Sequence, residues 1–240
     1  MSATMNASLT ENNLRQHTLK SFDVELNQMQ AQVAGMVGLV MYQLDQTMQA
    51  LHDADMAMAL KVVERDFKLD QYETQIDNTV IQVLARHCPV ANDLRIVISV
   101  SKIAYELEKM GDEITCFAKL VSKLFDPASS NPNPKLLADI VKIGDLVRTM
   151  LTKLLLALDK HELAQAYLLL QYDRECEIEL EEGIRHQLSF ILHDARLIHR
   201  AMDVMQIMKT LERCGEHSKN IAEYIVFMLE GVDIRHFSAG

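Results

Sequence analysis

The feature that most constrains this chain is a string at 107–112, LEKMGD, that returns 104 residues later as LERCGE at 211–216. Each copy sets two carboxylates four residues apart, which places them one turn apart on the same face of a helix. Each copy also has a glycine beside the second carboxylate. Glycine inside a helix costs about 1 kcal/mol relative to alanine, so its presence in both copies indicates a close approach by a neighbouring helix. The repeat predicts that the chain consists of two copies of one structural unit.

Helical sequence lies on both sides of a single proline-rich stretch. Three of the four prolines fall within residues 125–134, which we predict to be a linker. The flanking sequence is rich in Leu, Met, Gln, Glu and Lys, with apolar residues three or four apart and little alternation typical of strands. We expect six helices, at 14–51, 55–87, 90–124, 135–158, 162–192 and 195–230. Short connections imply antiparallel neighbours, so the predicted fold is all-α, with two tandem pseudo-symmetric three-helix bundles.

These boundaries divide the chain into five segments. We predict a flexible N-terminus at 1–13, a first three-helix bundle at 14–124, the linker at 125–134, a second three-helix bundle at 135–230 and a C-terminal tail at 231–240.

Charge and cysteine spacing narrow the class of protein. A formal net charge of -10 argues against binding nucleic acid through a broad basic surface. The four cysteines show no C-x-x-C spacing, and no apolar run begins the chain as a secretory signal would, so we expect a cytoplasmic protein. We find no uninterrupted apolar stretch long enough to cross a bilayer and therefore expect membrane contact only through partners.

The carboxylates of the first repeat string have counterparts on the preceding helix. If the chain folds back at Pro89, Asp66 lies opposite Asp112 and Asp70 lies opposite Glu108, because the members of each pair are equally far from the turn. We therefore predict four carboxylates at one level of the first bundle.

The second half of the chain repeats this arrangement. With a turn between residues 194 and 195, Asp173 lies opposite Glu216 and Glu177 lies opposite Glu212. Each bundle is thus expected to hold a four-carboxylate cluster on two facing helices.

Four carboxylates at one level repel one another, and a hard cation relieves that repulsion. Oxygen ligands suit iron, manganese, magnesium or calcium better than a tetrahedral structural zinc. The alternative is that nearby cations neutralise the clusters, namely Arg65, Lys109, Arg174 and Arg213. His217 follows the second string and could reach a metal, although a histidine on a helix surface is more often solvated or bonded to a carboxylate.

Motifs that would indicate an enzyme are missing from the sequence. No histidine has a glutamate three residues before it, as di-iron carboxylate enzymes require, and we find no Gly-rich phosphate loop, nucleophile elbow or H-E-x-x-H. We therefore predict that the protein is not an enzyme. Two alternatives stay open: a carboxylate-bridged iron redox or storage protein, and a helical adaptor that needs no metal.

Four segments of the chain carry a family resemblance. They are PVANDLR at 89–95, LEKMGD at 107–112, LERCGEH at 211–217 and KNIAEY at 219–224. With these motifs the chain resembles the PhoU family along nearly its whole length. The resemblance implies two pseudo-symmetric three-helix bundles whose carboxylate-x-x-x-carboxylate motifs hold metal ions or multinuclear iron clusters. Carried over by position, the metal residues are Asp66, Asp70, Glu108, Asp112, Asp173, Glu177, Glu212 and Glu216.

The resemblance also implies a role in regulation. Proteins of this kind restrain the phosphate-starvation response when phosphate is plentiful, and they contact the sensor histidine kinase of the phosphate regulon and the ATPase subunit of the phosphate ABC transporter. We expect the same partners here, together with a homodimer built on the repeated surfaces. The family usually has aspartate where Glu216 stands, so the second site is the less certain of the two.

Overall fold

The computed structural model describes residues 2–125, 134–160 and 162–235, with side chains from residue 21 onward. Its long helices are α1 (Ser2–Asp53), α2 (Met56–Glu64), α3 (Phe67–His87), α4 (Ala91–Leu124), α5 (Pro134–Lys160), α6 (Leu163–His193) and α7 (Ile198–Glu230). A 3₁₀ turn, Ala195–Leu197, precedes α7, and helices are the only regular elements in the described ranges. No helix in those ranges is both long enough and apolar enough to cross a membrane.

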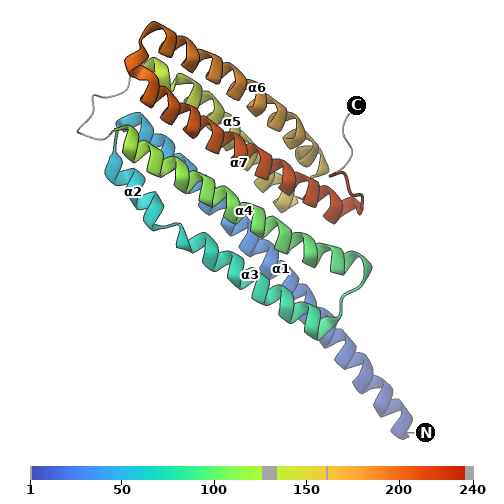
Figure 1. The fold of residues 1–240 in the computed structure, drawn as a ribbon. Coiled ribbons are helices and arrows are strands. Elements are labelled where there is room, and N and C mark those ends of the chain that lie inside the picture. Colours follow the sequence, from blue (N-terminus) through green and yellow to red (C-terminus); the bar gives the residue numbers. More distant parts are fainter. Residues whose placement is uncertain (1, 126–133, 161, 236–240) are drawn as a thin grey trace.

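The helices form two bundles that lie against each other (Figure 1). The first bundle contains α1, α4 and the consecutive helices α2 and α3, and the second contains α5, α6 and α7. Helices α4 and α7 run antiparallel along the boundary between the bundles, and α1 contacts α5 across the same boundary. The predicted fold class, two tandem three-helix bundles, is confirmed.

The helix expected at 55–87 is wrong in one respect, because the structure divides it into α2 and α3. Arg65 is the C-cap residue of α2, and its backbone N–H donates to the carbonyls of Val62 and Val63. Asp66 is the N-cap residue of α3. Neither residue is a helix breaker, so the periodic pattern continues through the break. The break brings Asp66 and Leu69 against Gly111 of α4, which is a contact between elements that local sequence does not specify.

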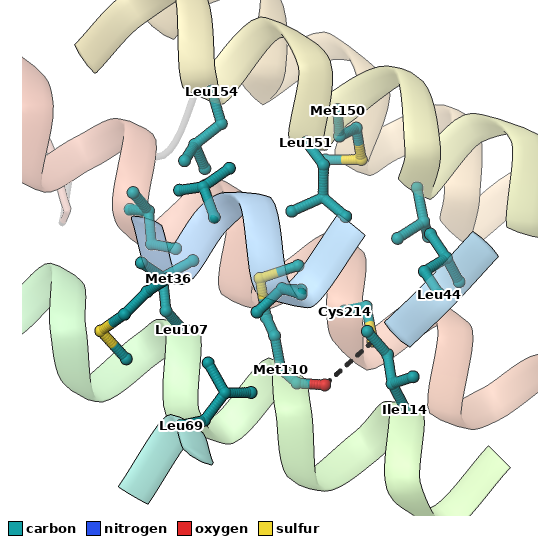
Figure 2. Close-up of a cluster of buried hydrophobic side chains, with 14 of the residues drawn as sticks. Met36, Leu44, Leu69, Leu107, Met110, Ile114, Met150, Leu151, Leu154 and Cys214 are labelled. Atoms are coloured by element: carbon teal, nitrogen blue, oxygen red, sulfur yellow. Dashed lines mark hydrogen bonds between the residues drawn. The ribbon is translucent and has the colours of Figure 1, made fainter. Parts of the chain in front are cut away.

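One hydrophobic core runs through both bundles. Figure 2 shows Leu69 of α3 and Leu107 of α4 in the same cluster as Leu151 of α5. Such side chains contribute about 1.5–3 kcal/mol each when fully buried, so the contacts at the boundary between the bundles also stabilise the fold. We expect the two halves of the chain to depend on each other for stability.

The antiparallel contact of α4 with α7 brings together equivalent residues of the internal repeat. The Cys214 thiol lies 3.9 Å from the Met110 carbonyl oxygen, and these residues hold the same position in the two copies (Figure 2). Two equivalent positions meet only where a two-fold axis passes between them. The pseudo-two-fold axis that relates the bundles therefore passes near Met110 and Cys214.

Candidate metal centres

The first carboxylate cluster forms where α3 begins beside the middle of α4. Asp66 and Asp70 lie at the start of α3, and Glu108 and Asp112 lie one turn apart on α4. Burial raises the pKa of Asp66, and the nearby charges of Asp112 and Asp70 raise it further, although the nearby Thr115 hydroxyl lowers it. Asp66 is therefore near Asp112, as we predicted from the equal distance of the two residues from the turn at Pro89.

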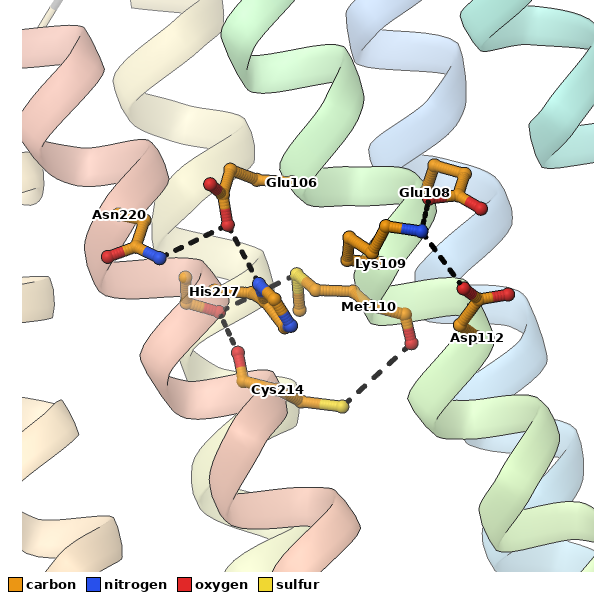
Figure 3. A network of polar contacts seen from close by, with 9 residues as sticks. Glu106, Glu108, Lys109, Met110, Asp112, Cys214, His217 and Asn220 are labelled. Carbon is orange, nitrogen blue, oxygen red and sulfur yellow. Dashed lines mark hydrogen bonds and ion pairs between the residues drawn. The ribbon is translucent and has the colours of Figure 1, made fainter.

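The pKa of Glu108 responds to the same cluster. Burial raises this pKa most, contact with Lys109 lowers it, and the charges of Asp112 and Asp70 raise it. The Lys109 ammonium lies 2.9 Å from Glu108 Oε2 and 3.3 Å from Asp112 Oδ2 (Figure 3). Despite that short distance, Glu108 Oε2 is buried without a hydrogen bond of good geometry. The four carboxylates are thus brought together, with a lysine bridging the two on α4.

Two further residues border the first cluster and were not among the predicted ligands. Thr115 is only 3% exposed, and its hydroxyl lies near Asp66 without a hydrogen bond of good geometry. Burial raises the pKa of Glu73, and the charge of Glu108 raises it further. Glu73 follows Asp70 by three residues and Thr115 follows Asp112 by three, so helical spacing was the signal that could have identified both.

The second cluster joins α6 and α7 in the same way. Asp173 is 4% exposed, and its carboxylate forms an ion pair with the Lys219 ammonium, with Nζ and Oδ2 3.0 Å apart. Burial raises the pKa of Glu212, and the charges of Glu216, Asp173 and Glu177 raise it further, against the lowering effect of Lys209. Glu177 and Glu216 are exposed at the rim of this cluster. Glu212 therefore lies near the other three predicted carboxylates of the second bundle.

The glycines of the repeat differ from the expectation that both mark a close helix approach. A Cβ atom at Gly111 would lie 2.2 Å from Leu69 Cδ1, so the approach is close there. At Gly215 the nearest atoms would be Cβ and Sγ of Cys176 at 3.5 Å, which is ordinary van der Waals contact. The prediction is confirmed for Gly111 but not for Gly215, because the neighbour of Gly111 is the long side chain of Leu69 and the neighbour of Gly215 is the shorter side chain of Cys176.

Two of the four cations expected to neutralise the clusters bind elsewhere. Arg65 donates to the Tyr42 hydroxyl at 2.9 Å, and Arg213 pairs with Glu113 across the bundle boundary at 3.1 Å. Lys109 does pair with cluster carboxylates, and Lys219 is a partner that the sequence analysis did not name.

His217 lies in a polar contact between the bundles. Its Nδ1 is 2.7 Å from Glu106 Oε2, and the Asn220 amide donates to the same oxygen at 3.1 Å (Figure 3). Glu106 is 8% exposed and stands on the face of α4 opposite to that of Glu108. His217 is therefore bonded to a carboxylate that lies apart from the predicted ligands.

The chemistry of the clusters suits a hard cation, although no ligand shell is preformed. In the part of the chain described, no group of three or more His, Cys, Asp or Glu side chains converges closely enough to hold a metal ion. The donors are carboxylate oxygens, which hard cations prefer, and Thr115 Oγ1 is buried without a hydrogen bond of good geometry, whereas Glu108 Oε2 lies 2.9 Å from the Lys109 ammonium. A cation could bind these carboxylates only if their side chains rotated inward.

The chain is similar to known proteins along most of its length. The family model described as the PhoU domain matches residues 33–121 and 140–225. The phosphate-specific transport system accessory protein PhoU homolog of Pseudomonas putida is 33% identical over 228 residues, which cover 95% of this chain and 88% of that protein. The PhoU protein of Escherichia coli strain K12 is 29% identical over 93% of this chain and 91% of its own length.

Solved structures agree with the sequence comparisons. The crystal structure of PhoU from Pseudomonas aeruginosa matches with a TM-score of 0.82 and 32% identity, covering 88% of this chain and 100% of that one. The phosphate transport system regulatory protein PhoU from Streptococcus pneumoniae matches with a TM-score of 0.79 and 26% identity, covering 88% of this chain and 98% of that one. By its fold, its repeat and its sequence, this chain belongs to the PhoU family.

Proposed function

We propose that this protein is a regulatory accessory protein of phosphate-specific transport that binds metal ions on its two carboxylate clusters. The relatives named above are accessory or regulatory proteins of phosphate transport systems, and the similarity extends over nearly the whole chain. The observation that carries the metal-binding part is the mirrored placement of four carboxylates in each bundle, with burial raising the pKa of Asp66, Glu108 and Glu212. Charges that are costly in the metal-free protein favour a bound cation.

The proposed ligands are the eight carboxylates predicted from the sequence. Asp66, Asp70, Glu108 and Asp112 would hold metal in the first bundle, and Asp173, Glu177, Glu212 and Glu216 would hold metal in the second. Iron, manganese and magnesium all suit these oxygen ligands. The metal would supply positive charge that fixes α3 to α4 and α6 to α7, which makes the shape of each bundle depend on metal binding.

The proposed role is negative regulation of the phosphate-starvation response in the cytoplasm. The protein would couple the ATPase subunit of the phosphate ABC transporter to the sensor histidine kinase, biasing the kinase toward its phosphatase-competent state when phosphate is plentiful. Phosphate-dependent crosslinking to the kinase tests this step. Stronger crosslinking in high phosphate supports it, whereas equal or absent crosslinking in high and low phosphate contradicts it.

A metal-independent adaptor is the second candidate function. The observation that favours it is that Lys109 and Lys219 already pair with cluster carboxylates. In an adaptor, Glu108→Ala or Asp112→Ala would leave partner binding unchanged, whereas a metal-dependent regulator would lose metal and alter its docking.

Elemental analysis of the purified, untagged protein tests metal binding directly. The informative variant combines Glu108→Ala, Asp112→Ala, Glu212→Ala and Glu216→Ala. The matched control removes four exposed carboxylates outside the clusters, through Asp93→Ala, Asp145→Ala, Glu181→Ala and Glu182→Ala. Metal that is stoichiometric in the wild type and control and lost from a still-helical cluster variant supports the proposal. Equal metal content in all three proteins, or none in any, overturns it.

A further inference from the structure

A small pocket lies between α1 and α2, which are neighbours in the first bundle (Figure 1). Its volume is about 220 Å³, below the roughly 300–1,000 Å³ of sites for drug-sized ligands, so it suits a ligand of few atoms. Its polar lining residues are Tyr42, Gln43 and Gln46 of α1, Lys61 of α2 and Arg65, the C-cap residue of α2. The other lining residues are apolar.

Both charged residues of this pocket are cations. Among the described residues no carboxylate lines it, although the chain has 34 acidic residues and only 24 Lys and Arg. The Arg65 guanidinium donates to the Tyr42 hydroxyl at 2.9 Å. Within the described ranges, neither Arg65 nor Lys61 has a carboxylate partner within 4 Å. The positive charge of the pocket is therefore not neutralised by the protein.

The pocket between α5 and α6 in the second bundle has the opposite character. Three carboxylates line it, those of Asp145, Glu175 and Glu179. Its lysine, Lys142, pairs with Glu179 at 3.5 Å. Such a lining repels an anion, whereas the lining between α1 and α2 attracts one. The difference is specific to the first bundle, where the second helix of the bundle is broken at Arg65.

A buried amide on the wall of the α1–α2 pocket also points to a polar ligand. Gln43 is 1% exposed, and neither its Nε2 nor its Oε1 has a hydrogen-bond partner. Buried polar groups without partners destabilise a fold, and nearly all such groups in proteins are paired. The dipole of α2 would by itself favour cations in its last turn, but it does not account for Gln43.

We propose that the pocket between α1 and α2 is a binding site for inorganic phosphate. Phosphate groups carry about −1.5 to −2 charges near neutral pH, which the two charges of Lys61 and Arg65 match. Ammonium, guanidinium and phenol groups all donate to phosphate oxygens. Gln43 Nε2 would donate to a further oxygen, and Gln43 Oε1 would accept from the O–H of hydrogen phosphate. The ligand thus supplies partners for every polar group that the pocket leaves unpaired.

Phosphate can reach this site without opening a bundle, since Lys61 and Arg65 are exposed. Helix α2 is the element that binding would fix, because only Ala59 and Val62 of its nine residues are buried. Arg65 directly precedes Asp66, so the start of α3 would respond as well. This inference does not depend on metal binding, and it gives the proposed regulatory role a direct contact with phosphate.

Calorimetry with potassium phosphate tests the site. The protein would be treated with EDTA and dialysed, and ionic strength would be held constant with potassium chloride so that only specific binding is measured. We expect one phosphate per chain, and an affinity about tenfold weaker or less in Lys61→Met and Arg65→Met, because each loses a charged donor. Lys153→Met is the matched control, since it removes a lysine that lies 5.3 Å from the centre of the Tyr172 ring in the second bundle.

Gln43→Met gives a measurement in which the predicted effects have opposite signs. The side chain keeps its approximate size and loses an unpaired amide, so the melting temperature without phosphate should rise by a few degrees. Phosphate should then stabilise this variant less than it stabilises the wild type. Gln28→Met, at an exposed position of the same helix, should change neither quantity.

The outcomes are distinct from those for metal binding, which elemental analysis measures separately. One bound phosphate that is weakened by Lys61→Met and Arg65→Met but not by Lys153→Met supports the site. Absence of binding to the wild type at millimolar phosphate overturns it. Binding that is equal in the wild type and in all three pocket variants, with folding confirmed by circular dichroism, also overturns it. A lower melting temperature in phosphate-free Gln43→Met would show that the amide is a structural group and contradict its role as a ligand.

Discussion

At the scale of single residues, Gly111 and Gly215 hold the same place in the repeat but meet different neighbours. A methyl group on Gly111 would meet buried Leu69 at 2.2 Å, whereas one on Gly215 would meet Cys176 at 3.5 Å. Overpacking costs about 1–3 kcal/mol, and replacing glycine by alanine in a helix gains about 1 kcal/mol. We expect Gly111→Ala to lower the free energy of unfolding and Gly215→Ala to leave it unchanged or raise it. Urea denaturation of both variants is the measurement, and equal effects would contradict the difference in spacing.

The pH dependence of stability is set by residues such as Glu212. Its raised pKa makes ionisation costly in the folded state, so its contribution to stability is present below the unfolded pKa and is lost as pH rises through the folded value. We therefore expect Glu212→Gln to raise the melting temperature of the EDTA-treated protein near neutral pH and to change it little near pH 4.5, the ordinary pKa of a glutamate.

The control for that experiment is Glu182→Gln, which removes an exposed carboxylate of α6 outside the cluster. It should give a similar melting temperature to the wild type at both pH values. A Glu212→Gln protein no more stable than this control at neutral pH would show that the cluster carboxylates do not repel one another.

At the scale of helices, the contact of α4 with α7 depends on the buried carboxylate of Glu106. Its Oε2 lies close to both His217 and Asn220, so Glu106→Ala leaves these two side chains without their shared partner. Because His217 and Asn220 are half-buried and water can replace part of the lost contact, we expect the unfolding free energy to fall by about 1 kcal/mol. A double-mutant cycle with His217→Ala measures the pair itself, and a coupling near zero would contradict a stabilising contact.

Helices were the most predictable elements and their interruptions the least. Apolar spacing located the helical regions, because periodicity is a local property of the chain, but α1 begins at Ser2, where we predicted a flexible N-terminus at 1–13. It did not locate the break at Arg65 and Asp66, which creates the contact of Leu69 with Gly111. The residues of the linker at 126–133 lie outside those described, and the predicted segment boundaries stay predictions.

At the scale of the whole molecule, the two bundles share one core and are joined at both ends of α4. Arg95 donates to the Met228 carbonyl at 3.2 Å near the start of α4, and Lys123 pairs with Asp203 at 2.6 Å near its end. We expect thermal unfolding of the full chain to be one cooperative transition with the same midpoint by circular dichroism and by calorimetry. Two resolved transitions would show that the bundles unfold independently.

The sequence by itself determined the helices, the duplication, the family resemblance and the pairing of carboxylates across each turn. All of these follow from spacing along one chain, since residues equally far from a turn in antiparallel helices reach the same height. Only the tertiary structure decided which cation each carboxylate meets, which glycine is crowded and where the second helix breaks. Those outcomes depend on which side chains meet between helices and on competition among partners. Arg213, for example, pairs with Glu113 of the other bundle, and Lys219 reaches Asp173.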